Sequence, residues 1–258
     1  MTRDRAAVGV RTRTERFYVR MAATFLAVGV IGFMPTYWLP LLRGTLHVHP
    51  WTHFHALFFY GWLTLFVTQT SLAASGRLAR HRELGVLGVA LVSGMCFVGL
   101  GMTVHSLKSS IALGFDDAAR AFSIVSATAI VLFAALFAAA IVNVKRPDVH
   151  KRLMLVATAS ILQAAVGRVF LLVIASRPFE GVVGANGPPP VAVTVGPALV
   201  VDLLIVIAMV HDRRTRGRIH PVYWIAGGIV LAVQVLRVPI STTAAWTHVT
   251  SWLLAIAP

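Results

Sequence analysis

The stretch ARAFSIVSATAIVLFAALFAAAIVN, residues 119–143, decides the fold class. From 121 to 142 it contains no charged residue. At 1.5 Å per residue, this uncharged run forms a helix about 33 Å long, which matches the roughly 30 Å hydrocarbon core of a bilayer. A strand in lipid would leave its backbone hydrogen-bonding groups without partners, so the sequence predicts a transmembrane helix here.

Six further stretches are apolar over a similar length, and the overall composition also indicates a membrane protein. Of the 258 residues, 57% are hydrophobic and 12% are charged, whereas a soluble domain of this length needs more polar surface. A β-barrel would show alternating segments of about half this length. We therefore predict an all-α integral membrane bundle of about seven transmembrane helices. The spans lie near 17–39, 51–74, 84–106, 119–143, 152–175, 191–210 and 221–240.

The basic residues predict the orientation of these spans. Of the 23 Lys and Arg residues, 17 lie in the N-terminal segment and in the loops after the second, fourth and sixth spans. Cytoplasmic loops carry this excess, so we expect the N-terminus inside and the C-terminus outside. Topology thus explains the net charge of +14, and no motif of a nucleic-acid-binding module accompanies it.

The chain divides into three segments without an internal repeat. Residues 1–16 form a basic cytoplasmic segment, 17–243 the seven-helix transmembrane domain, and 244–258 an interfacial tail. The tail is too short to span, and its apolar residues recur at near-helical spacing. The first span lacks an A-x-A cleavage pattern, so we expect it to be retained. The Gly- and Pro-rich loop at 177–190 is expected to be irregular and extracytoplasmic.

Ionisable and imidazole groups from five spans fall at one level in the outer half of the predicted bundle. They are His53, His55, His105, Arg168, Asp202 and Arg237. Charged groups are costly in a span and usually face the bundle interior, so this set predicts an internal polar site. Asp202 needs a cationic partner, and we expect it to contact Arg168 or Arg237 directly or through a water molecule. The alternative is that the histidines lie among lipid headgroups and the arginines extend outward.

The segment HVHPWTHFHALFFYGW, residues 47–62, concentrates four of the ten histidines. Pro50 suits the first turn of a helix, so His47 and His49 should precede the helix, and His53 and His55 should lie within it. His55, Trp62 and Gln69 recur every seven residues, which predicts one shared face toward the bundle interior.

Two cofactor chemistries fit these residues. In the first, His55 and His105 ligate a haem b iron, Arg168 and Arg237 pair with its propionates, and Trp62, Gln69 and Asp202 line the site. In the second, a copper or zinc ion binds His47, His49, His53 and His55 at the outer surface. The third possibility is no cofactor. A permease or sensor would then bind an anionic ligand at an Arg168–Asp202–Arg237 core.

Four more histidines stand beside basic residues on the predicted cytoplasmic side. They are His81, His150, His211 and His220. Histidines at the starts of helices are usually solvated, and we expect the same here. The alternative is a second haem on this inner side.

Three segments carry a resemblance to a family of uncharacterised bacterial inner-membrane proteins. They are HFHALFFYGWLTLFVTQTSLAASGRLARHRELG (53–85), RPDVHKRLMLVATASILQAAVGR (146–168) and HDRRTRGRIHP (211–221). The HxH, HRxLG and HKRLM motifs are more remotely similar to cytochrome oxidase assembly membrane proteins and membrane b-type cytochromes. This resemblance implies the bacterial inner membrane, respiratory-chain partners, and functional roles for His55, His81, His150 and Arg168.

Overall fold

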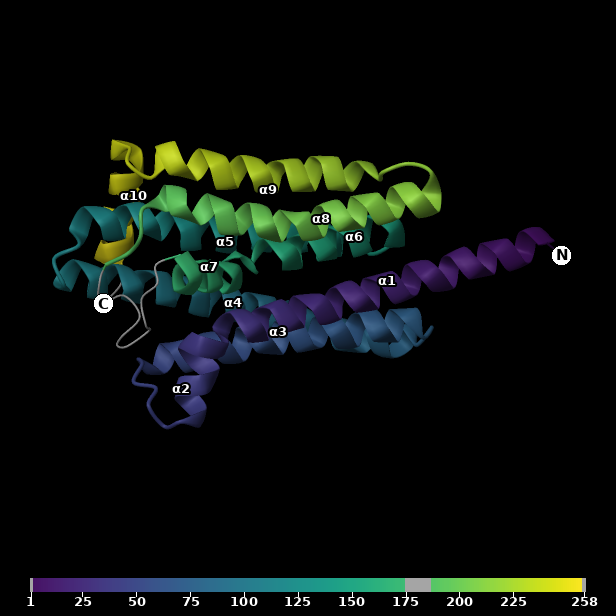
Figure 1. Ribbon diagram of the computed structural model, residues 1–258, viewed down its shortest axis with the longest axis horizontal. Coiled ribbons are helices and arrows are strands. Elements are labelled where there is room, and N and C mark those ends of the chain that lie inside the picture. Colours follow the sequence, from purple (N-terminus) through teal and green to yellow (C-terminus); the bar gives the residue numbers. More distant parts are fainter. Residues whose placement is uncertain (1, 175–186, 257–258) are drawn as a thin grey trace.

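Helices make up all the regular secondary structure in the computed structural model, which describes residues 2–174 and 187–256 (Figure 1). The chain order is α1 (Thr2–Phe33), the π-helical turn η1 (Met34–Trp38), α2 (Leu39–Leu42), α3 (Pro50–Ala74), α4 (Leu78–Ala112), α5 (Asp116–Val142), α6 (Pro147–Ser160), α7 (Gln163–Ile174), the 3-10 turn η2 (Val191–Thr194), α8 (Val195–Arg216), α9 (Pro221–Ile240) and α10 (Ala244–Ile256).

The described residues contain seven segments long and apolar enough to cross a membrane, which confirms the predicted bundle. These segments are Thr14–Leu42, Pro50–Ala74, Leu78–Ala112, Asp116–Val142, Pro147–Leu171, Val191–Arg216 and Pro221–Ile240. The third is longer than the predicted 84–106 stretch and begins at Leu78. The fifth begins at Pro147 rather than at residue 152. The HRELG and HKRLM motifs are therefore helical.

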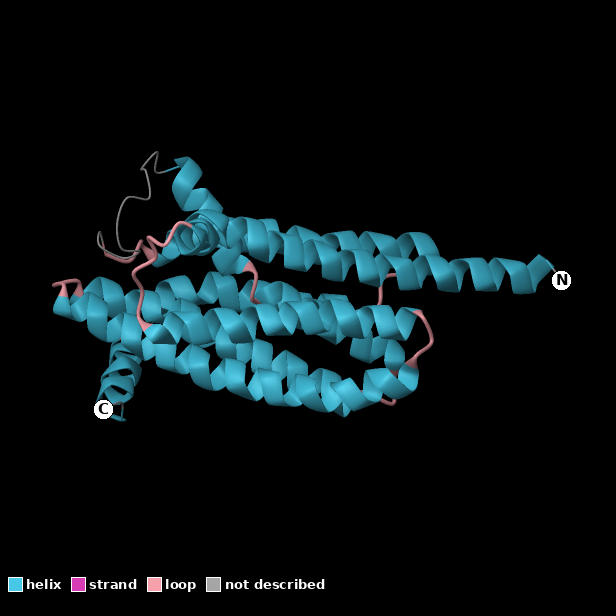
Figure 2. Cartoon of the chain, turned by 90° about the horizontal axis from the view of Figure 1, so that it is seen from below, coloured by secondary structure: helices cyan, strands magenta, loops and turns pink. Residues whose placement is uncertain are grey.

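The long helices lie side by side along the longest axis of the molecule (Figures 1 and 2). α3 packs between α1 and α4, α5 packs between α4 and α6, and α8 and α9 pack against α6. Trp62, Phe133 and Phe137 are buried in the core between these helices. Large apolar side chains on the periphery are exposed, including Phe97 at 71% and Val142 at 82%. Such a surface suits contact with lipid.

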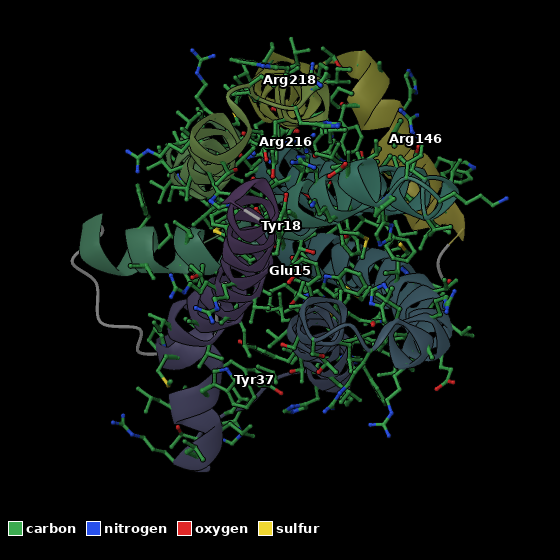
Figure 3. The ribbon with its side chains drawn as sticks, turned by 90° about the vertical axis from the view of Figure 1, so that its right-hand side faces the viewer. Glu15, Tyr18, Tyr37, Arg146, Arg216 and Arg218 are labelled. Carbon is green, nitrogen blue, oxygen red and sulfur yellow. The ribbon has the colours of Figure 1, made fainter. Side chains whose placement is uncertain are left out.

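One end of the bundle carries the basic loops, and we call it the basic end. Figure 3 views the molecule from this end and labels Arg146, Arg216 and Arg218 there, together with Glu15 and Tyr18 of α1. The charge bias predicts that this end faces the cytoplasm. The opposite end, which carries α10, is called the far end.

Two of the spans are interrupted within their length, and the sixth begins with the 3-10 turn η2. η1 interrupts the first span with a π-turn that contains Pro35. The fifth span breaks at Ile161 and Leu162, where Leu162 N–H donates to the Ala159 carbonyl oxygen at 3.0 Å and Ala165 N–H donates to Leu162 at 3.0 Å. After the break, α7 turns away from the long axis of the bundle (Figure 3).

The C-terminal tail forms the predicted short helix. α10 runs across the far end, at a steep angle to the spans (Figures 1 and 2). Arg120 of α5 holds it, because its Nη1 donates to Thr250 and Ser251 at 3.1 Å each. Trp246 Nε1 donates to the Arg120 carbonyl oxygen at 2.8 Å. Most of the loop expected at 177–190 lies outside the described residues.

Candidate functional site

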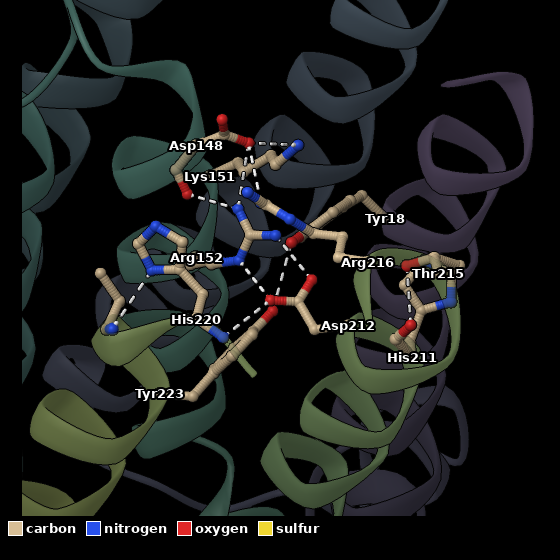
Figure 4. A network of polar contacts seen from close by, with 11 residues as sticks. Tyr18, Asp148, Lys151, Arg152, His211, Asp212, Thr215, Arg216, His220 and Tyr223 are labelled. Carbon is tan, nitrogen blue, oxygen red and sulfur yellow. Dashed lines mark hydrogen bonds and ion pairs between the residues drawn. The ribbon is translucent and has the colours of Figure 1, made fainter. Parts of the chain in front are cut away.

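A buried ion pair lies at the basic end, among residues that the sequence indicated as loop charges. Arg152 of α6 donates from Nε and Nη2 to the two carboxylate oxygens of Asp212 of α8, at 2.9 and 2.6 Å (Figure 4). Neither side chain is exposed by more than 1%. A bidentate pair of this kind is strong because both charges are fully hydrogen-bonded. It fixes α6 against α8.

A polar network surrounds this pair and joins two further elements, α1 and α9, to it. Asp148 accepts from Arg152 at 3.2 Å and pairs with Lys151 and Arg216. The hydroxyls of Tyr18 and Tyr223 lie 3.2 Å apart and connect α1 with α9 beside the guanidinium of Arg152. These groups satisfy one another, so the network is best explained as a structural connection.

His220 ends this network at the start of α9. Its ring Nδ1 accepts from the backbone N–H of Val222 at 3.2 Å. The backbone N–H of His220 donates to a carboxylate oxygen of Asp212 at 3.2 Å. Burial lowers the pKa of His220 below its ordinary value of 6.5, and the neighbouring cations Arg152 and Arg216 lower it further. The neutral imidazole is therefore the capping form. His49 caps α3 in the same way, through the N–H of Trp51.

The basic end also brings together two histidines that lie far apart in the sequence. The ring centres of His81 of α4 and His150 of α6 are 6.4 Å apart, with ring planes at 89°. His81 Nδ1 lies 3.2 Å from the carbonyl oxygen of Gln69, and His150 Nδ1 lies 2.8 Å from that of Ala140. A carbonyl oxygen only accepts, so each Nδ1 carries the proton and each Nε2 keeps a lone pair. Both rings are half-buried and bonded to the protein, so they are less solvated than we expected.

The two histidines occupy equivalent places in two helical hairpins. His81 is the fourth residue of α4 and His150 the fourth of α6, and each follows an arginine by four residues, Arg77 and Arg146. Each imidazole reaches back to the preceding helix of its hairpin. The resemblance implied functional roles for His81 and His150, but their contact was not predicted, although the repeated R-x-x-x-H-[RK] spacing was a signal that could have indicated it.

Gln69 belongs to the same site at the basic end. Its Nε2 donates to the carbonyl oxygen of His81 at 3.1 Å, so Gln69 and His81 form two reciprocal hydrogen bonds. Its Oε1 is buried and has no protein partner. Trp62 is 2% exposed and His55 half-buried, so the predicted inward face of α3 is observed. Its three residues are nevertheless spread along the helix and do not form one pocket.

The histidines of the far end are distributed among different partners. The ring of His105 lies against His49, with centres 4.3 Å apart, whereas the ring of His55 stacks on Phe59. His53 lies 3.0 Å from the hydroxyl of Tyr37, and His47 is exposed. α4 continues to Ala112, so His105 lies within the helix and not at its end.

No three His, Cys, Asp or Glu side chains within 2–174 and 187–256 are placed to hold one metal ion. The structure therefore does not bring His47, His49, His53 and His55 together as a metal site. It likewise gives His55 and His105, the predicted haem ligands, different ring neighbours.

Arg168 and Arg237 also occupy separate places. Arg168 of α7 donates from Nε to Thr36 Oγ1 at 3.1 Å, and its guanidinium carbon lies 4.4 Å from the ring centre of Phe33. Arg237 of α9 is 3% exposed and donates from Nη2 to Thr194 Oγ1 at 2.8 Å.

Asp202 takes its hydrogen bond from an amide rather than from an arginine. Gln234 Nε2 donates to Asp202 Oδ1 at 3.2 Å, and no ion pair joins Asp202 to Arg168 or Arg237 in the described chain. The direct form of the predicted contact is therefore not observed, although Asp202 and Arg237 interact electrostatically. The contact through water stays a prediction. Three buried atoms here have no protein partner: Asp202 Oδ2, Gln234 Oε1 and Arg237 Nε.

Comparisons with family models, with curated proteins and with solved structures found no match for this chain. The functional conclusions therefore rest on the geometry.

Proposed function

We propose that this chain is a haem-binding membrane protein that serves electron transfer or respiratory-complex assembly, with His81 and His150 as its two iron ligands. The separation of the two imidazoles carries the proposal. Two nitrogens at about 2 Å on opposite sides of one iron place the ring centres roughly 6 Å apart. The observed separation is 6.4 Å.

The hydrogen bonds of the two rings support the same assignment. Each Nδ1 is held by a backbone carbonyl, and this second-shell contact is the usual way to orient a ligating histidine. The free Nε2 atoms are then the available ligands. A bound haem would supply a reversible one-electron couple, and His81 and His150 would hold its iron.

The number of protein ligands favours haem over a bare copper or zinc ion. A structural zinc ion takes four protein ligands, and the described chain offers no group of three. The porphyrin supplies four nitrogens of its own, so two imidazoles complete the coordination of its iron.

An absorption spectrum tests the proposal, with four histidine variants to locate the site. Protein expressed with added haem precursor should show a Soret band, and His81→Ala and His150→Ala should each abolish it. His55→Ala and His105→Ala should leave it intact. The reverse pattern would move the haem to the site that the sequence alone indicated. A colourless wild-type protein would refute haem binding.

A carrier or sensor for a small polar solute is the second candidate, because of the three unpartnered atoms at Asp202, Gln234 and Arg237. A buried polar atom without a partner is costly, and a polar ligand would remove that cost. Under this alternative the purified protein has no Soret band. Binding of the solute would then depend on Asp202.

A further inference from the structure

The two interruptions of the spans meet at one place toward the far end. The π-turn η1 lies in the first span, and the break between α6 and α7 lies in the fifth. α1 and α7 approach closely just before η1: a Cβ built on Gly32 would lie 2.6 Å from the carbonyl carbon of Ala165. π-turns and broken helices at membrane depth are common at binding sites, where the irregular backbone serves the ligand.

Arg168 and Thr36 connect these two interruptions. Thr36 of η1 is 7% exposed, and its hydroxyl accepts from Arg168 Nε. This bond and the ring of Phe33 fix the plane of the guanidinium. The side chain is half-buried, and within the described ranges the two η nitrogens have no acceptor.

Within 2–174 and 187–256, no acid balances the charge of Arg168. Among the described residues, Arg168 forms no ion pair, and the titratable groups that interact with it are His55 and Tyr60. This differs from Arg152, whose charge is matched by Asp212. An unmatched cation in a membrane span is costly and is a candidate ligand-binding residue.

The free atoms define the chemistry of the ligand. With Nε occupied by Thr36, the two η nitrogens present an end-on fork, and such a fork fits the two oxygens of a carboxylate or phosphate. Val169 and Leu171, which follow Arg168 on α7, are each 37% exposed and offer apolar surface in the same helix. We propose that Arg168, Thr36 and His55 form a site for the oxyanion headgroup of an amphiphile in the far-end leaflet.

Binding of three probes to the protein in an uncharged detergent tests this site. The probes are oleate, oleyl alcohol (the same tail without the anion) and dioleoyl phosphatidylglycerol. Wild-type protein should bind oleate at least about tenfold more tightly than oleyl alcohol, which corresponds to one charge-assisted fork. Arg168→Gln should reduce oleate binding to the level of the alcohol. Arg168→Lys, which keeps the charge and loses the fork, should fall between them.

Arg43→Gln is the matched control, because Arg43 is an exposed arginine just beyond α2, near the same end. It should bind oleate as the wild type does. Competition with phosphatidylglycerol identifies the source of the oxyanion: competition assigns a phospholipid phosphate, and its absence assigns a free carboxylate.

Equal binding of oleate and oleyl alcohol by the wild type would overturn the proposal, and so would undiminished binding by Arg168→Gln. If Arg168→Gln fails to fold, Thr36→Val replaces it. This variant keeps the cation but releases Nε, so oleate affinity should still fall severalfold.

Discussion

The two ends of the bundle differ in how their buried arginines are paired. At the basic end, Arg152 is fully buried and both oxygens of Asp212 accept its hydrogen bonds. Toward the far end, Arg168 and Arg237 take threonine hydroxyls as acceptors and have no ion pair in the described chain. Matched charges hold helices together, whereas unmatched charges remain available to a ligand. The comparison therefore separates a structural site from a candidate binding site.

The largest effect is expected from Arg152→Met, which leaves Asp212 buried without its cation. Removing one partner of a buried ion pair costs about 3–5 kcal/mol. The free energy of unfolding in mixed detergent micelles should fall by this amount. Asp148→Asn is the control, since that side chain is 56% exposed, and its cost should be about 1 kcal/mol or less. Similar losses in both variants would mean that the buried pair contributes no more to the free energy of unfolding than the exposed Asp148 does.

A smaller loss is expected from Gly32→Ala at the contact between α1 and α7. The new Cβ would press on the backbone of Ala165, which moves less easily than a side-chain end. Overpacking of this kind costs about 1–3 kcal/mol. Gly228→Ala is the matched control, because a Cβ there meets nothing within 4 Å, and stability should stay equal or rise. Thermal unfolding of the two variants distinguishes the contact from a general effect of added methyl groups.

The spans were predictable because hydropathy and a rise of 1.5 Å per residue are local properties. The exact starts of α4 and α6 were not, because hydropathy places the spans at 84 and 152, whereas both helices continue through the charged residues before these positions. The partners across helices were also hidden. Arg152 and Asp212 lie 60 residues apart, and nothing local indicates which of the 23 cations pairs with that acid.

At the far end, sequence reasoning predicted the depth of the polar residues but not their partners. Depth along each span predicted one level for His55, His105, Arg168, Asp202 and Arg237, but depth does not give the rotation of a helix about its axis. The π-turn at η1 and the break before α7 change that rotation locally, so Arg168 meets Thr36 instead of Asp202. The repeated R-x-x-x-H spacing was readable in the sequence, whereas the meeting of its two histidines required the fold.

Arg168→Met tests the comparison between the two ends of the bundle. The substitution is the same as at Arg152, but we expect the free energy of unfolding to change in the opposite direction. Removing an unmatched charge from a membrane span relieves a desolvation cost. We expect the free energy of unfolding in oleate-free detergent to stay the same or rise by up to about 2 kcal/mol. A loss comparable to that of Arg152→Met would show that Arg168 is a structural residue, and the contrast between the two ends would not hold.

The smallest effect concerns pH and the histidine that caps α9. Burial and the cations Arg152 and Arg216 lower the pKa of His220, while Asp212 and Asp148 act weakly in the opposite direction. The unfolded chain therefore takes up this proton at a higher pH than the folded protein does. Stability from this group is complete above pH 6.5 and is lost as the pH falls through 6.5 toward the lowered pKa. A protonated Nδ1 also cannot accept from Val222.

His220→Asn isolates this contribution, because asparagine caps a helix and does not titrate in this range. Unfolding of both proteins measured between pH 8 and about pH 5.5 should show a steeper decline for the wild type than for the variant. Parallel curves would mean that His220 does not couple folding to pH.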